Sequence, residues 1–492
     1  MDRFDEAASK HVQDHMLLQQ GLPNTGDEER QGLPISNDLL QKRSFAHVLR
    51  IPAEIYALIF EFRVSMDALS SYNFFFDDTT KAPWVLGQVC TRWRNIVHDA
   101  PALWTIVRVS TCLLQECPQP EESIVEMLKC YLGRSRALPI SLFLLSEEYF
   151  PEPILKPLLD CSDRWRDVFL FLHPDHLPRF LPIRDRLHQL RTMSLIPTVP
   201  NNTTDYMRDM FQSAPSLESL ALNGHSLELG LSFPWAQIRI FEANYVDPAD
   251  ILRIMPCMPR MLRLQLGREP PEHMAEDTTN WVVRHDGIRS FSLDSVDEHI
   301  EGHPADLIDH LDLPAMSSLS IQCDRPENME AISELLQRSA CTIRELKLDI
   351  RFDNADRLLR LLRTQPRLAQ VQKLALHDGE PIGGLGFTTA LSVASDDPAS
   401  AIMPMMDEMD ILLSTDEPGS FVQRWLGVFE SRVNPAQPAD PQLPRVQSLK
   451  RITIGCRSGS GVVDDSTCMN RFRALVQAGV LLELNCGVGV ED

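Results

Sequence analysis

The chain has 492 residues, of which 43 % are hydrophobic and 24 % charged, an ordinary globular composition with enough length for several domains. Its formal net charge of −22 argues against nucleic acid or an anionic membrane surface as the primary partner, because clustered Lys and Arg bind both. No apolar run is long enough to span a membrane and no secretion signal is evident, so we expect a cytoplasmic or nuclear protein. Eleven scattered cysteines without a Cys-x-x-Cys spacing predict reduced thiols.

The first 46 residues combine charges of both signs with Gln and Gly and offer little apolar surface. We therefore predict that 1–46 is a disordered N-terminal segment. The next stretch, 47–110, predicts a unit of two short helices with an insert at 66–82 between them. Pro52 and Pro83 stand where the helices would begin, because a proline is tolerated at the first helical position.

Both predicted helices carry apolar residues at helical spacing. These are Ile55, Leu58, Ile59 and Phe62 in the first helix, and Leu86, Val89, Cys90, Trp93, Ile96 and Val97 in the second. Because so small a unit cannot bury both stripes by itself, we expect a partner surface. The alternative is an ordinary helical pair packed on the domain behind it, since periodicity alone does not distinguish a core from an interface.

The motifs of this unit resemble the F-box. Ile51-Pro52-x-Glu54 and Ile59-Phe60 resemble its opening, Val89-Cys90-x-x-Trp93-Arg94 its second helix, and Leu103-Trp104 its end. The departures are Ile51 in place of the usual leucine and the insert at 66–82, of a kind familiar in fungal members. The resemblance implies that the helices dock on a Skp-type adaptor. The residues assigned to this contact, or to the packing that shapes it, are Ile51, Pro52, Ile55, Ile59, Phe60, Val89, Cys90, Trp93, Leu103 and Trp104.

After the helical unit one pattern recurs: an apolar residue, two variable residues, apolar, one variable, apolar. Its clear copies are Leu217–Leu222, Met261–Leu266, Ile288–Leu293, Met316–Ile321, Ile343–Leu348, Val371–Leu376 and Leu449–Ile454, and looser copies end at Leu142, Leu170, Leu195 and Ile240. Most copies follow one another at about 27 residues, within the range of leucine-rich repeats. The alternation that ends each copy predicts a half-buried strand, and helical patterns lie between many of the strands.

The recurring pattern resembles a degenerate leucine-rich repeat that lacks the asparagine of strict repeats. Met127–Leu142 and Asp163–Leu170 also resemble the region that follows the F-box in mushroom-type fungal F-box proteins. We therefore predict an α/β fold, with the small helical F-box unit followed over 111–492 by a degenerate leucine-rich-repeat-like α/β solenoid. A non-solenoid α/β domain is the alternative. An irregular insertion is expected at 377–444, where the repeat pattern is interrupted. Because the gap from Leu376 to Ile454 is close to three periods, we expect at least one repeat there to be rewritten rather than absent.

The chain contains no motif that predicts an active site. His299 and His303 flank a glutamate, but Gly302 and Pro304 break the helix that a metalloprotease motif needs. The stretch Ser458–Gly461 lacks the residues of a phosphate loop or a hydrolase elbow. We expect no enzymatic activity, no metal and no cofactor.

The resemblance implies a substrate-recognition adaptor of an SCF-type (cullin-RING) ubiquitin ligase. Its partners would be a Skp-type adaptor with the cullin-RING ligase, and an unidentified protein substrate on the solenoid. Polar or small residues of the concave face would meet that substrate or only solvate the sheet: Ser194, Ala221, Arg239, Gln265, Ser292, Ser320, Lys347, Ala375 and Thr453. The alternative is a leucine-rich-repeat interaction scaffold outside any ligase, with the helical stripes buried against the first repeat. Exposure of the stripes distinguishes the two.

Overall fold

The chain divides into two compact units, Met1–Tyr56 and Ala57–Asp492. The computed structural model describes residues 51–70, 75–111, 120–146, 150–198, 208–223, 230–244, 246–267, 282–294, 307–322, 326–350, 355–378, 385–394, 400–413, 418–435, 437, 445–456 and 466–486. Within the first unit this covers residues 51–56, so the predicted disordered segment 1–46 lies outside the described residues.

Helices open the described part of the chain. These are α3 (Ala53–Ser70), α4 (Trp84–Val89), α5 (Thr91–Asp99) and the 3-10 helix η1 (Pro101–Trp104). The sequence pattern predicts one helix from Pro83 to Asp99, but the extended backbone of Cys90 (φ −161°, ψ 167°) divides it into α4 and α5. Likewise α3 continues to Ser70, into the stretch predicted as an insert.

One parallel sheet dominates the second unit and confirms the α/β class. In spatial order its described strands are β1 (Ile106–Ser110), β2 (Ile140–Ser146), β3 (Trp165–Leu172), β4 (Thr192–Pro197), β5 (Ser219–Asn223), β6 (Ile240–Asn244), β7 (Arg263–Leu266), β9 (Ser290–Asp294), β11 (Ser318–Gln322), β12 (Glu345–Ile350), β13 (Lys373–Asp378), β14 (Glu408–Leu413), β15 (Arg451–Cys456) and β16 (Leu481–Cys486). Apart from β8 and β10, which pair separately, spatial order follows chain order, so each strand contacts its sequence neighbours.

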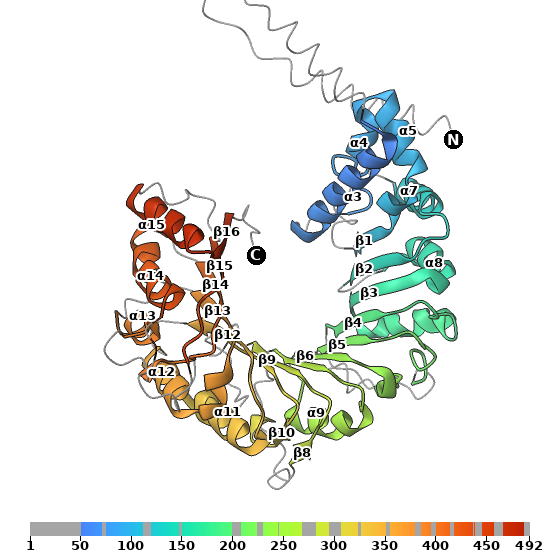
Figure 1. Ribbon diagram of the computed structural model, residues 1–492. Coiled ribbons are helices and arrows are strands. Elements are labelled where there is room, and N and C mark those ends of the chain that lie inside the picture. Colours follow the sequence, from blue (N-terminus) through green and yellow to red (C-terminus); the bar gives the residue numbers. More distant parts are fainter. Residues whose placement is uncertain are drawn as a thin grey trace, which may run out of the picture. The chain divides into compact units, whose positions relative to one another are not determined.

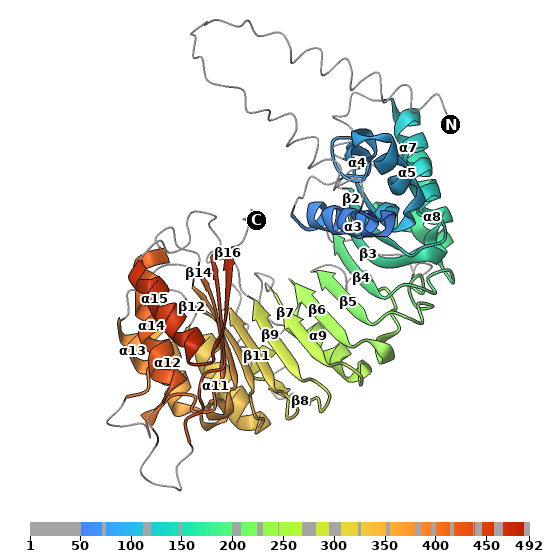
Figure 2. The ribbon, with the colours of Figure 1, turned by 45° about the horizontal axis from the view of Figure 1, so that its top comes forward.

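Helical segments connect the strands and lie along the outer side of the curved sheet (Figure 1), which Figure 2 shows from a second direction. They are α7 (Glu121–Arg134), α8 (Glu152–Asp160), η2 (Ser162–Arg164), η3 (Pro174–Ile183), η6 (Trp235–Gln237), α9 (Pro248–Ile254), η7 (Met255–Cys257), α11 (Pro326–Ser339), α12 (Ala355–Thr364), η8 (Pro366–Gln370), α13 (Leu385–Leu391), α14 (Pro418–Val433) and α15 (Ser466–Gln477). Since a parallel connection needs a crossover, these segments return the chain to the start of the next strand.

Two ladders of apolar side chains form the core between sheet and helices. The first ladder contains Val107, Leu142, Val168, Met193, Leu220, Phe241, Leu264, Phe291, Leu319, Leu346, Leu374, Met409 and Ile452. The second contains Val109, Leu144, Leu170, Leu195, Leu222, Ala243, Leu266, Leu293, Ile321, Leu348, Leu376, Ile411 and Ile454. All are buried, and burying one such large side chain contributes about 1.5–3 kcal/mol.

The register of β6 differs from the predicted one. Ile240, taken as the end of a repeat copy, stands at the start of β6 opposite Ser219. The small residue Ala243 occupies the second ladder position instead, opposite Leu222. Arg239 consequently lies before the strand, outside the row of concave-face residues to which we assigned it.

The stretch 377–444, expected to be an irregular insertion, contains a further strand of the sheet. Met409 and Ile411 of β14 continue the two core ladders between β13 and β15. Two helices, α13 and α14, flank this strand in the chain. The longer connections on both sides of β14 hide this repeat from a search for a constant period.

A fully buried arginine joins α14 to the preceding repeat. Arg432 donates from Nε to the carbonyl of Leu391 at 2.7 Å, from one terminal nitrogen to Met403 at 3.2 Å, and from the other to Ile402. Leu391 is the last residue of α13, whose final carbonyls have no partner within the helix. Burial lowers the pKa of Arg432 to about 10, so the side chain stays charged at neutral pH.

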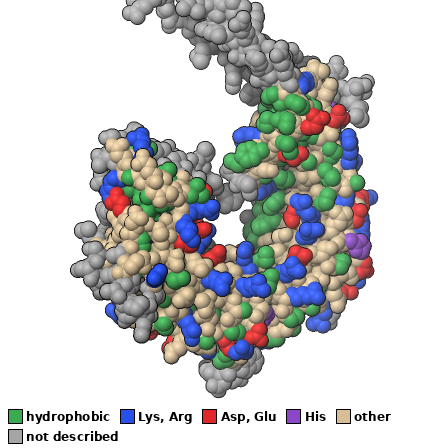
Figure 3. Space-filling model, viewed as in Figure 1, with side chains coloured by type: hydrophobic (Ala, Val, Ile, Leu, Met, Phe, Trp, Pro, Cys, Tyr) green, Lys and Arg blue, Asp and Glu red, His purple; other side chains and the backbone are tan. Residues whose placement is uncertain are grey.

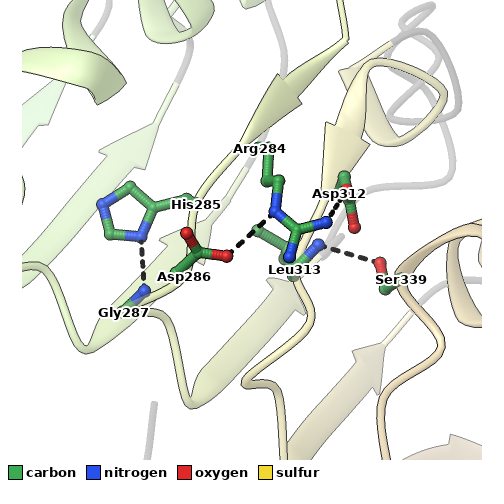
Figure 4. Close-up of polar contacts among 7 residues, drawn as sticks. All are labelled: Arg284, His285, Asp286, Gly287, Asp312, Leu313 and Ser339. Atoms are coloured by element: carbon green, nitrogen blue, oxygen red, sulfur yellow. Dashed lines mark hydrogen bonds and ion pairs between the residues drawn. The ribbon is translucent and has the colours of Figure 1, made fainter.

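The short strands β8 (Val283–Arg284) and β10 (Leu311–Asp312) form a second, two-stranded sheet. Arg284 pairs with Asp286 at 3.0 Å and with Asp312 at 3.2 Å (Figure 4). The buried His285 accepts from the amide of Gly287 through Nδ1, so its Nε2 carries the proton and donates to the carbonyl of Met258. These contacts fix the turn between β8 and β9.

Candidate functional site

Helix α3 has one buried and one exposed apolar side. Phe60 and Val64 are buried, and the ring of Phe60 lies 4.8 Å from that of Trp93 in α5. Leu58, Ile59 and Phe62 are instead 59 %, 50 % and 69 % exposed. In a helix, residues three and four apart share a side, so the exposed residues form one strip.

Helix α4 also carries exposed apolar side chains. We define the apolar helix face as Leu58, Ile59, Phe62 and Met66 of α3 with Val85 and Val89 of α4, all large and exposed. Figure 3 shows hydrophobic side chains gathered over these helices. Large contiguous apolar patches on a protein surface mark interaction sites, whereas single exposed apolar residues do not.

The residues predicted for the adaptor contact fall into two groups. Ile59 and Val89 belong to the apolar helix face, and in the first unit Pro52 and Ile55 are exposed. The buried ones are Phe60, Leu103 and Trp104, whereas Ile51, Cys90 and Trp93 are half-buried. The buried and half-buried residues therefore pack inside the helical unit. Helical spacing predicts this division only in part.

An aromatic cluster packs the helices against the first repeat. The rings of Trp84 and Trp104 lie 4.9 Å apart, and Tyr131 of α7 lies 5.0 Å from Trp104. The guanidinium of Arg134 stands over both tryptophans, 5.1 Å from the ring centre of Trp84 and 4.5 Å from that of Trp104. Trp104 also donates to the carbonyl of Val97 at 2.9 Å. Complete burial raises the pKa of Tyr131, which keeps the phenol neutral.

The inner side of the sheet carries a continuous row of residues between the two core ladders. The row contains Arg108, Phe143, Phe169, Ser194, Ala221, Glu242, Gln265, Ser292, Ser320, Lys347, Ala375, Asp410, Thr453 and Glu483. Every predicted concave-face residue except Arg239 lies in it, and Glu242 takes the place of Arg239.

The chemistry of this row changes along the sheet. At its start the rings of Phe143 and Phe169 lie 6.2 Å apart, and Arg108 stands over Phe143. At its end Lys373 pairs with Asp410 at 3.2 Å, and this hydrogen bond raises the pKa of the lysine. The sequence analysis missed both features, because the partners are separated by one repeat or more and only the register brings them together.

The motifs considered for chemistry gain no support from the described residues. His299, His303 and Ser458–Gly461 lie outside the described residues. In the part of the chain that the structure describes, no group of three or more His, Cys, Asp or Glu could hold a metal ion. Among the described helices none has the length and apolar character needed to cross a membrane.

The described residues thus present two surfaces of a kind that binds other proteins: the apolar helix face and the inner side of the sheet. Comparison of the chain with models of known protein families and with curated proteins gave no match.

Proposed function

We propose that the chain is a substrate-recognition adaptor of an SCF-type ubiquitin ligase, whose apolar helix face binds a Skp-type adaptor. The observation that carries this proposal is the exposure of Leu58, Ile59 and Phe62 within the stretch whose motifs resemble the F-box. Exposure of apolar side chains to water is unfavourable. A partner that covers them stabilises the complex by about 25 cal/mol per Å² of apolar surface buried.

The exposed strip favours this function over a scaffold outside any ligase. A scaffold that used the helices only as internal structure would bury their apolar residues against the first repeat. In α3 the burial of Phe60 and Val64 already meets that structural need. The opposite side of the helix remains exposed, which an internal role does not require.

The parallel sheet supplies the second half of the proposal. We infer that its curved, degenerate leucine-rich-repeat-like array holds a protein substrate on the inner side. Such a subunit does no chemistry itself, since it raises the effective concentration of substrate lysines near the ubiquitin-loaded enzyme.

Co-purification of the full chain with a Skp-type adaptor tests the proposal. The variant Leu58→Ser/Phe62→Ser removes two exposed anchors without disturbing the core. The matched control, Leu262→Ser/Val476→Ser, replaces two large apolar residues that are also exposed but lie outside the helical unit, before β7 and in α15. We expect the first variant to weaken binding by about 30-fold or more, since burying two such side chains contributes about 2–4 kcal/mol.

Retention of adaptor binding by the Leu58/Phe62 variant would contradict the assignment of this face. If the wild-type chain fails to bind the adaptor where an established F-box protein succeeds, the ligase function is wrong and the scaffold function takes its place.

A further inference from the structure

A chain of backbone hydrogen bonds runs along the edge of the sheet where the strands begin. The carbonyl of the residue that precedes one strand accepts from the start of the next, as Arg239 does from the amides of Leu262 and Arg263. The positions linked in this way are Arg166, Arg191, Glu218, Arg239, Leu262, Arg289, Ser317, Arg344, Gln372, Asp407 and Lys450. Neighbouring positions are therefore one strand spacing apart, about 4.8 Å.

This edge concentrates exposed arginines that the sequence scatters over more than a hundred residues. We define the arginine ladder as Arg191, Arg239, Arg289 and Arg344 together with Arg263, the first residue of β7. All five side chains are exposed. Figure 3 shows basic side chains along the arc of the strands.

The side chains of the ladder have no carboxylate partner among the described residues, in contrast to basic residues at either end. Arg166 pairs with Asp167 at 2.9 Å, and Lys450 with Asp407 at 2.8 Å. Glu218 and Glu345 are the acidic residues nearest the ladder in register, and neither forms an ion pair with it. Five arginines without an ion pair among the described residues, with Glu218 between Arg191 and Arg239, thus line one edge of a chain whose formal net charge is −22.

We propose that the arginine ladder binds an extended acidic segment of a partner protein, with carboxylates spread along it. Arg239, Arg289 and Arg344 directly precede the alternate strands β6, β9 and β12, so the three span about 19 Å. Guanidinium groups bind carboxylates through paired hydrogen bonds. A segment in the extended polyproline II conformation has three residues per turn and rises about 3.1 Å per residue, so carboxylates at every third residue lie on one side about 9.3 Å apart and match alternate strands.

The spacing favours distributed carboxylates over a single phosphate. A phosphate dianion is compact, and tight binding needs several donors that converge on it, whereas each ladder position carries one arginine on its own strand. Repulsion from the rest of the acidic chain does not reach far, because the screening length at physiological salt is about 8 Å. The acidic chemistry of the partner follows from the ladder itself. Only the identification of that partner as the ligase substrate rests on the proposed function.

The test is fluorescence anisotropy of the full chain, without adaptor, with a labelled 12-residue peptide that carries Glu at every third position. The test variant is Arg239→Gln/Arg289→Gln/Arg344→Gln. The matched control, Arg357→Gln/Arg360→Gln/Arg363→Gln, makes the same change in net charge at three exposed arginines of α12, on the helix side of the sheet. We expect the ladder variant to weaken binding by about tenfold or more, since three guanidinium–carboxylate pairs are lost, and the control variant to bind like wild type.

Three further probes decide the ligand chemistry. A peptide with Gln in place of Glu should bind at least tenfold more weakly. Equal losses in the two triple variants would reduce the effect to general charge and overturn the inference. The other two probes are a peptide with one phosphoserine and a single-stranded DNA of 20 nucleotides. If either binds more tightly than the Glu peptide, and its binding depends on the ladder, the proposed acidic segment is wrong and that ligand takes its place. Adaptor binding is measured separately, so its failure leaves this result intact.

Discussion

Replacement of Arg432 by methionine tests the carbonyl-binding arginine between α13 and α14. Methionine fills much of the same volume but donates no hydrogen bond, so the carbonyls of Leu391 and Ile402 lose their donor, whereas that of Met403 still accepts from the amide of Met406. Each buried carbonyl left without a partner costs about 1–3 kcal/mol. Removing a buried charge returns part of this cost as desolvation, so for two carbonyls we expect a net loss of about 2 kcal/mol in the free energy of unfolding.

The lysine variant sharpens the test. Arg432→Lys keeps the buried charge but shortens the side chain and leaves one donating nitrogen. That nitrogen cannot reach all three carbonyls to which the three guanidinium nitrogens donate. We therefore expect Arg432→Lys to be at least as unstable as Arg432→Met in urea unfolding followed by circular dichroism. Arg471, which is partly exposed and paired with Glu430 at 2.6 Å, is the control, and Arg471→Met should cost less than about 1 kcal/mol. A loss below about 1 kcal/mol in Arg432→Met, or a lysine variant clearly more stable than the methionine variant, would refute the reasoning.

Three further changes test other features of the fold. Burial raises the pKa of Asp77 above its usual 3.8, so the folded chain loses stability as the pH rises from 3.8 through the raised pKa. Asp77→Asn should therefore raise the melting temperature at pH 7. The gain should vanish below about pH 4, where the aspartate is protonated as well. Trp104→Ala removes a fully buried ring and its bond to Val97, and should cost about 3–5 kcal/mol in urea unfolding, with a smaller loss for Trp104→Phe. Gly287→Ala would place a Cβ 2.9 Å from the carbonyl of Met261 and should cost about 1–3 kcal/mol, whereas Gly427→Ala, where nothing lies within 4 Å, should cost little.

The strands of the sheet were predictable where the apolar pattern is strong. In β7, β9, β11, β12 and β13 two large apolar residues flank a polar or small one, and this alternation predicts one side of a strand in the core. The α/β class follows from these strands and the helical patterns between them.

The errors occurred where a local residue type conflicts with its position. At β6 the ladder residue is the small Ala243, while the apolar Ile240 stands one position outside the core pattern, so the predicted register is wrong. A rewritten repeat was expected between β13 and β15, but the position of β14 was not predicted, because its connections are longer than the repeat. For both, the deciding information is the pairing with the neighbouring strand, which a single sequence does not contain.

The candidate surfaces were predictable to different degrees. Helical spacing identified Ile59 and Phe62 as one stripe, but only packing shows that Phe60, between them in sequence, lies on the buried side. The arginine ladder was not predictable, because its members belong to different repeats and become neighbours through strand register.

The aromatic junction around Trp104 leaves one residue, Thr105, between η1 and the first strand of the sheet. Such a connection acts as a fixed spacer rather than a tether. A flexible tether lets a bound molecule sample a volume, and its effective concentration falls gradually as the tether lengthens. With a fixed spacer, a molecule held on the sheet is presented to anything held on the helices at one distance and one orientation. Within such an assembly, target sites on the bound molecule would be selected by their position along it, and insertion of a few residues at Thr105 would change which sites are reached.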